Sequence, residues 1–63
     1  MVLGVIFDTG SGKYLQLATF SMWTSAKEQA DKFKPSELLE VIQNNRLEYL
    51  MKAGTLQYHL VSM

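Results

Sequence analysis

The residues best suited to chemistry stand at the end of the first apolar segment. Val5-Ile6-Phe7 runs directly into Asp8-Thr9-Gly10-Ser11, so an apolar strand would deliver the Asp8 carboxylate to a turn. A carboxylate can serve as a general acid or base, but this chemistry needs a second carboxylate that shares its proton. The segment occurs once, so the second carboxylate would have to be Asp8 of a symmetry mate.

This segment resembles the signature of the aspartic proteases, in which an apolar strand delivers Asp-Thr-Gly-Ser into the active site. The resemblance implies a dimeric protease like the retroviral enzymes, with Asp8 as its acid and base. Those enzymes also have a flap hairpin and an apolar-apolar-Gly segment near the end, and neither is recognisable in this chain. Asp, Thr, Gly and Ser are also ordinary residues of a hairpin turn, which is the role that we expect here.

The other candidate motifs predict no catalytic, cofactor or metal site. Gly10-Ser11-Gly12-Lys13 is followed by Tyr14, where a phosphate-binding loop has Ser or Thr, and it leads into a predicted strand. His59 is the single histidine, and the chain has no cysteine. Metal sites in proteins use several such ligands, so we expect no metal, no cofactor and no enzymatic activity.

The aromatic and methionine residues between positions 20 and 23 are the best candidates for binding a partner. Trp23 is the only tryptophan, with Phe20 and Met22 beside it. It can pack a helix against the sheet, or it can form a contact surface, because Trp and Met are frequent in such surfaces. Tyr14, Phe20 and Tyr58 could form a stacking platform for nucleic acid, but they lack a basic surround, so sheet packing is preferred.

Composition predicts one small folded domain, residues 1–63. The chain is 48% hydrophobic, which excludes a disordered protein, and its formal net charge is zero, which argues against a nucleic-acid or membrane surface. Met1 to Phe7 is too short for a signal peptide or a membrane span, so we expect an intracellular protein.

Two strands are predicted first. Val2 to Phe7 reads as a buried strand, residues 8–12 as a turn and residues 13–20 as a second strand that completes an antiparallel hairpin. In the second strand, alternation places Tyr14, Gln16, Ala18 and Phe20 on one face.

Two helices and a closing strand should follow. Ser25 and Glu28 have the spacing of a capping box for a first helix with Ala26, Ala30 and Phe33 inward, before Pro35. A second helix is capped by Ser36 and has an apolar stripe of Leu38, Leu39, Val41 and Ile42. Asn44-Asn45 interrupts it. Residues 46–53 then continue as helix to Gly54, or residues 47–52 form a strand. With either alternative, residues 56–61 form the last strand.

The predicted fold is therefore α+β, a three-stranded antiparallel sheet in the order ββααβ with two helices on one face. The alternative has four strands, ββααββ. Because Val2 and Ile6 would face one way and Leu3, Val5 and Phe7 the other, helices on one face would leave apolar side chains exposed. We therefore expect a homodimer, or a higher symmetric oligomer, joined partly through the sheet.

One broader pattern covers most of the chain: Gly12-Lys13-Tyr14-Leu15, then Trp23, then Ala30-Asp31-Lys32-Phe33 and a helix from Ser36. It resembles small phage and prophage accessory proteins. The resemblance implies a non-enzymatic protein of the bacterial cytoplasm that binds and inhibits a host protein or defence component. A protein that binds or sequesters a small molecule or nucleotide is the alternative, and a dimeric aspartic protease and a sheet-type nucleic-acid binder follow.

Overall fold

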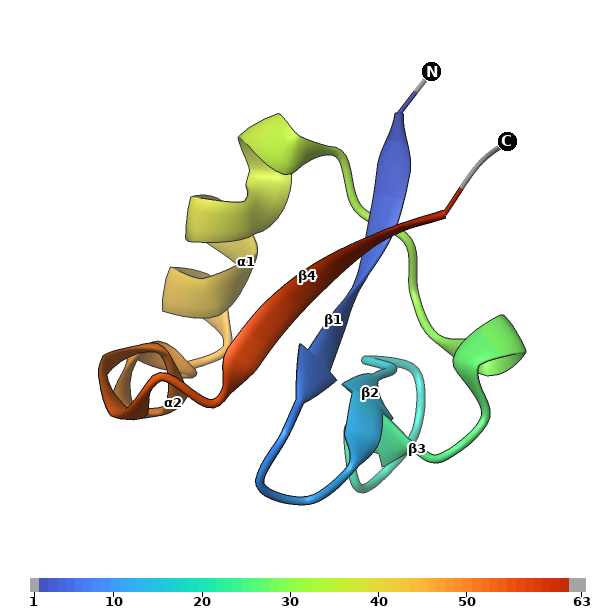
Figure 1. Cartoon of the computed structure of the whole chain (residues 1–63), viewed down its shortest axis with the longest axis horizontal. Coiled ribbons are helices and arrows are strands. Elements are labelled where there is room, and N and C mark those ends of the chain that lie inside the picture. Colours follow the sequence, from blue (N-terminus) through green and yellow to red (C-terminus); the bar gives the residue numbers. More distant parts are fainter. Residues whose placement is uncertain (1, 62–63) are drawn as a thin grey trace.

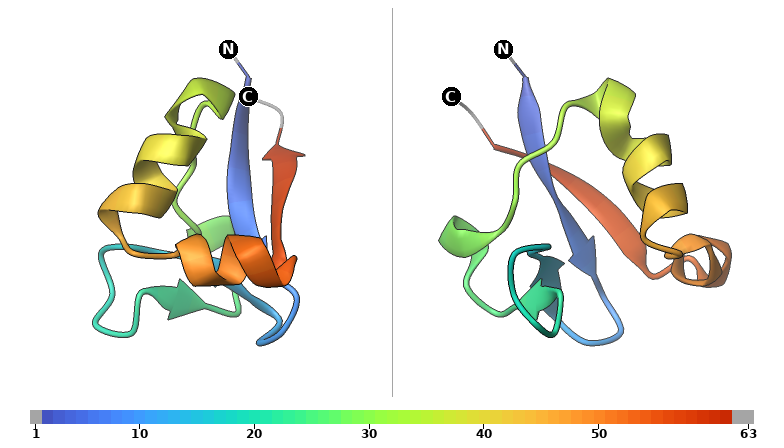
Figure 2. Two further views of the ribbon diagram at one scale, coloured as in Figure 1. Left: turned by 90° about the vertical axis from the view of Figure 1, so that its left-hand side faces the viewer. Right: turned by 180° about the vertical axis from the view of Figure 1, so that it is seen from behind.

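β1 is one of the two inner strands of an antiparallel sheet with the order β3-β2-β1-β4, in a computed structural model that describes residues 2–61. Two short α-helices lie on the same side of the sheet (Figures 1 and 2). The strands are β1 (Leu3–Asp8), β2 (Lys13–Leu15), β3 (Trp23–Thr24) and β4 (Leu56–Val61), and the helices are α1 (Leu38–Asn44) and α2 (Glu48–Ala53). The α+β class and the helices on one face are as predicted.

The sheet has four strands, which agrees with the four-stranded alternative and not with the three-stranded prediction. The additional strand is β3, which pairs with β2. Residues 47–52, the segment considered as a strand in that alternative, are helical from Glu48 onward and belong to α2, with Leu47 just before it. Their Leu, Glu, Met and Lys residues are good helix formers, which explains this outcome.

The first hairpin forms as predicted but is shorter. β1 pairs with β2 through Phe7 and Tyr14 and through Asp8 and Lys13, with residues 9–12 as the turn between them. The prediction of a strand to Phe20 was wrong, because β2 ends at Leu15. The chain then turns over residues 16–22, so the expected alternation of faces beyond Tyr14 does not occur.

The predicted first helix is absent. Residues 27–29 form a single 3₁₀ turn (η1, Lys27–Gln29), and Ser25 caps nothing, because the residue before the turn is Ala26 in an extended conformation. The chain then runs beside β1, where Phe33 and Gly4 exchange two backbone hydrogen bonds of 2.8 and 2.9 Å. These bonds require an extended backbone at Phe33, so pairing with β1 overrides the local helical signal. Phe33 is nevertheless buried, as predicted.

The second helical region agrees better with the sequence, but the prediction that Ser36 caps it was wrong, because Ser36 lies inside the opening 3₁₀ turn and Glu37 precedes α1. Pro35 opens a 3₁₀ turn (η2, Pro35–Glu37) that leads into α1, and the Lys34 amide donates to the Glu37 carboxylate at 2.8 Å. Leu39 was assigned wrongly to the apolar stripe, since it is 57% exposed. Arg46 has a φ of 56°, which separates α1 from α2, and Gly54 ends α2 in the predicted left-handed conformation with a φ of 75°.

The core lies between the sheet and the helices. Its buried members come from β1, β2, the segment beside β1, α1 and the residue before α2: Ile6, Leu15, Phe33, Ile42 and Leu47. Partly buried side chains surround them, including Met22, Trp23, Leu50 and Tyr58. The core therefore joins all the described elements except the turns at the surface.

The face of β1 opposite Ile6 is covered better than the sequence suggested. Val5 is completely buried, and the Phe7 ring lies against two neighbouring rings, with centroid distances of 4.8 Å to Tyr14 and 5.3 Å to His59. Aromatic pairs at this spacing stabilise a sheet surface. The chain's own rings therefore shield this face, and the expected dimer needs a different structural reason.

Candidate functional site

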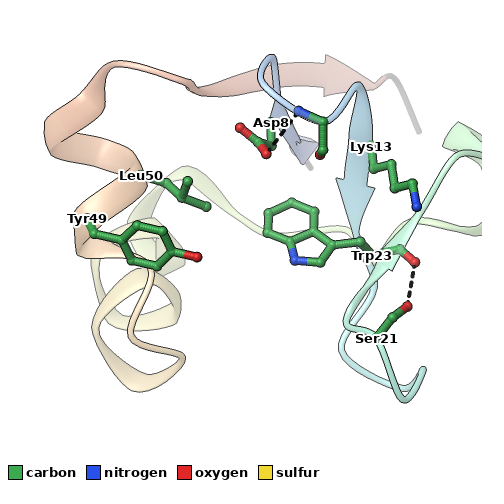
Figure 3. A pocket seen from close by; sticks show the side chains of 7 residues that line it. Asp8, Lys13, Ser21, Trp23, Tyr49 and Leu50 are labelled. Atoms are coloured by element: carbon green, nitrogen blue, oxygen red, sulfur yellow. Dashed lines mark hydrogen bonds between the residues drawn. The ribbon is translucent and has the colours of Figure 1, made fainter.

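The candidate site is an open pocket of about 210 Å³ between the sheet and α2. Trp23 stands on one side, and Tyr49 and Leu50 stand on the other, as Figure 3 shows. Its remaining lining residues come from the end of β1, the first turn, β2 and the residue before Met22: Asp8, Ser11, Lys13 and Ser21. We call this hollow the Trp23 pocket.

Strand pairing explains why these residues meet. Trp23 lies opposite Leu15 in the β2–β3 pair, and Lys13 lies opposite Asp8 in the β1–β2 pair. Side chains of residues two apart in a strand point to the same face, so Lys13, Leu15 and Trp23 all face the helices. Leu15 is buried in the core, whereas Trp23, farther from β1, is only half-buried and forms the pocket wall.

Asp8 holds the turn beside the pocket. Its carboxylate accepts hydrogen bonds from the backbone amides of Gly10 at 3.1 Å and Ser11 at 3.3 Å. Burial alone would raise the pKa of Asp8, but the Ser11 and Thr55 hydroxyls and these two amides outweigh it and lower the pKa below its ordinary value. The carboxylate is thus ionised at neutral pH and engaged in the turn, as expected from the residue types.

A second feature is the loop of residues 16–22, which we call the Phe20 loop. It is closed by a hydrogen bond of 2.9 Å from the Gln16 amide to the Met22 carbonyl. The Thr19 hydroxyl donates to the Gln16 carbonyl at 2.9 Å, and the Asp31 carboxylate accepts from the Leu17 amide at 2.8 Å. The loop is therefore held internally and tied to the segment that runs beside β1.

The three residues predicted to bind a partner have different environments. Phe20 is fully exposed, at 108% of its reference surface, whereas Met22 is half-buried and packs against the core. Trp23 has two roles: it packs against the core, and it also lines the Trp23 pocket. Ser21 joins the two features, since it follows Phe20, lines the pocket and donates a hydrogen bond to the Trp23 carbonyl at 3.1 Å.

Tyr49 and Leu50 were missed as site residues. They come from α2, far from Trp23 in the sequence, and only the packing of α2 brings them to the pocket. Tyr49 gave one usable signal. Among the residues of α2 it is the one aromatic side chain, and the structure leaves it 66% exposed.

His59 lies on the opposite face of the sheet from the pocket, where its Nε2 is 2.8 Å from Oε1 of Gln57. Among residues 2–61, no three His, Cys, Asp or Glu side chains are grouped so that they could hold a metal ion. Over the same residues, no helix is both long enough and apolar enough to cross a membrane.

Comparisons with models of protein families, with curated proteins and with solved structures find no match for this chain. The Trp23 pocket and the Phe20 loop are therefore the features of this chain that indicate a function.

Proposed function

We propose that this chain is a non-enzymatic protein-binding module whose contact surface combines the Phe20 loop with the Trp23 pocket. The observation that carries the proposal is the complete exposure of Phe20 on a hydrogen-bonded loop next to an open aromatic pocket. An exposed phenylalanine costs free energy in water, and exposed aromatic residues are typical centres of protein interfaces.

The constraint on the loop adds to this argument. Binding normally orders the contacting segment, at about 0.5–1.5 kcal/mol for each side chain that becomes fixed. Here the Gln16 to Met22 bond and the Asp31 carboxylate already fix the backbone on both sides of Phe20. A partner would therefore meet a preformed projection and lose less affinity to ordering.

The size of the pocket favours a protein partner over a free small molecule. Pockets for drug-sized ligands have volumes of roughly 300–1,000 Å³. The Trp23 pocket, at about 210 Å³ and open to solvent, fits a single side chain better. In the proposed complex, Phe20 enters the partner while one partner side chain packs between Trp23 and Tyr49. The resemblance to phage accessory proteins suggests a bacterial host protein as the partner, with inhibition as the result.

A photo-crosslinking amino acid at position 20 tests this proposal. The same group at Leu39, an exposed leucine on α1, is the matched control. In a bacterial lysate we expect defined protein adducts from position 20 that disappear when Trp23 is replaced by Ala, and no such adducts from position 39. Equal labelling from both positions would contradict the proposal.

The variant Phe20→Ala separates binding from folding. Because the ring is fully exposed, its removal should change the free energy of unfolding by less than about 0.5 kcal/mol. The adducted protein, once identified, should bind this variant at least tenfold more weakly. A variant that binds normally would show that Phe20 is not part of the contact.

A further inference from the structure

The outer edge of β4 is an open edge of the sheet, separate from the Trp23 pocket. Within residues 2–61, β4 is the last strand of the sheet and pairs only with β1. In Figure 1 no described element lies in front of β4, and in the left view of Figure 2 none lies beyond it on the side away from β1. The free edge of a six-residue strand is therefore open to solvent in the described part of the chain.

The hydrogen bonds of Gly4 show which backbone groups of β4 point outward. Gly4 uses its N–H and C=O to bond Phe33, on the side of β1 away from β4. Gly4 and Leu60 are therefore a pair without mutual hydrogen bonds, and such pairs alternate along an antiparallel ladder. It follows that Leu56, Tyr58 and Leu60 direct their N–H and C=O groups away from β1, toward the open edge.

β4 lacks the features that usually protect an edge strand. Native edges are blocked by charged residues, proline, bulges or short length. Leu56–Val61 contains no charged residue and no proline, and it pairs with β1 in unbroken register over its whole length. The opposite edge, β3, has only two residues and is protected by its short length.

We infer that β4 pairs in antiparallel fashion with β4 of a second copy, across a two-fold axis at Tyr58, to form one continuous sheet. This register pairs Tyr58 with Tyr58 of the second copy, and Leu56 with Leu60. Each of these residues has its N–H and C=O directed outward, so each pair exchanges two hydrogen bonds. Within residues 56–61, a register shifted by two residues in either direction would leave one outward-facing residue of each strand unpaired.

The side chains of β4 suit a second copy of the same strand. On the helix face, Leu60 is 64% exposed, and the axis places it beside Leu56 of the second copy. Leu56 borders an apolar groove of about 110 Å³ that Ile42 and Met51 also line, so the pairing covers leucine with leucine. On the other face, Gln57 meets His59. No charged side chains oppose one another, and the net charge of zero leaves no overall repulsion between copies.

Sedimentation equilibrium of the full chain, from micromolar to submillimolar concentration, tests the inference. We expect a mass of about twice 7.2 kDa at the upper end of this range. A mass that stays near 7.2 kDa would overturn the inference. This result would also be obtained if the edge of β4 binds a strand of another protein, and that outcome counts against the inference too. Amide hydrogen exchange locates the interface. In the dimer the Leu56, Tyr58 and Leu60 amides should be protected, and their rapid exchange in a dimeric sample would also overturn the inference.

Matched variants complete the test. Leu60→Lys should weaken the dimer at least tenfold, whereas Leu39→Lys, at a leucine of similar exposure on α1, should leave it unchanged. If Leu60→Lys does not fold, a synthetic chain with an N-methyl group on Leu60 removes the outward N–H and keeps every side chain. A dimer that withstands the N-methyl group would refute edge pairing. Phe20→Ala should remain dimeric, so failure here is distinguishable from failure of the proposed contact surface.

Discussion

Gly4→Ala is expected to destabilise the fold strongly, because the Tyr58 ring lies across Gly4. A Cβ atom at this position would be 2.5 Å from Cε1 and Cζ of Tyr58 and 2.8 Å from the His59 carbonyl oxygen. Carbon atoms normally pack at about 3.5–4.0 Å, so the ring would have to move by roughly 1 Å. The Tyr58 hydroxyl donates to the Phe33 carbonyl at 2.6 Å, and this bond would be strained or lost.

The expected cost follows from these two effects. Overpacking in a buried region costs about 1–3 kcal/mol, and a lost hydrogen bond adds about 1 kcal/mol. The sum of about 2–4 kcal/mol is a large part of the roughly 3–9 kcal/mol expected for a domain of this size. With a urea dependence near 1 kcal/mol per molar, the midpoint should fall by about 2 M or more. Trp23 fluorescence at fixed protein concentration reports the transition.

Two comparisons make this prediction refutable. Gly10→Ala is the control, because a Cβ there would lie 3.5 Å from the Asp8 carboxylate, which is an ordinary contact. In a Tyr58→Ala background, Gly4→Ala should cost at least about 1 kcal/mol less than in the native chain, since the obstructing ring is gone. If Gly4→Ala is as mild as Gly10→Ala, or shows no coupling to Tyr58, the placement of the ring over Gly4 is wrong.

Two further predictions concern Asp8 and Trp23. The pKa of Asp8 is lowered in the folded state, so near this pKa the unfolded chain binds more protons than the folded chain. The ionised Asp8 carboxylate therefore stabilises the fold above the ordinary pKa of 3.8. This stabilisation is lost as the pH falls through the lower pKa of the folded state. The thermal midpoint should therefore drop below pH 4, and less steeply in Asp8→Asn; equal slopes would contradict the assignment. Trp23→Ala should cost about 1.5–3 kcal/mol, because the ring is half-buried, and should remain folded in circular dichroism at low temperature. Complete unfolding would show that Trp23 is mainly a core residue.

The parts of the fold that were predictable have strong local signals. β1 is a continuous apolar run that ends at a turn of Asp, Gly and Ser, and Gly54 supplies the positive φ that ends α2. β4 alternates clearly enough to be predicted with its correct bounds, Leu56–Val61. At these positions the local preference and the final structure agree.

The two main errors come from interactions between distant residues. β2 ends at Leu15 because the following amides bond within the Phe20 loop and to Asp31. Met22 has a φ of 65° in this loop. Glycine is the residue that usually predicts a positive φ, and position 22 is a methionine. The expected first helix does not form, because the backbone of Phe33 is hydrogen-bonded to Gly4. These two residues are far apart in the sequence, so the local pattern around Phe33 could not predict the bonds.

The candidate site was predictable only in part. The residue types of Phe20 and Trp23 predict a contact surface, and the two residues lie close together because they are near each other in the sequence. The opposite wall of the pocket, Tyr49 and Leu50, depends on how α2 packs against the sheet. A binding surface built from two separate segments is therefore visible from the sequence only on one side.

The position of β1 between β2 and β4 has a consequence for folding kinetics. Its two partner strands come from opposite directions along the chain, β2 after a short turn and β4 only after both helices. The β1–β2 hairpin and the two helices can form from local contacts, whereas pairing Leu3 with Val61 requires closure of a loop that spans nearly the whole described chain. During synthesis β1 is made before both helices and β4, so one edge of this apolar strand remains unpaired until the last strand arrives.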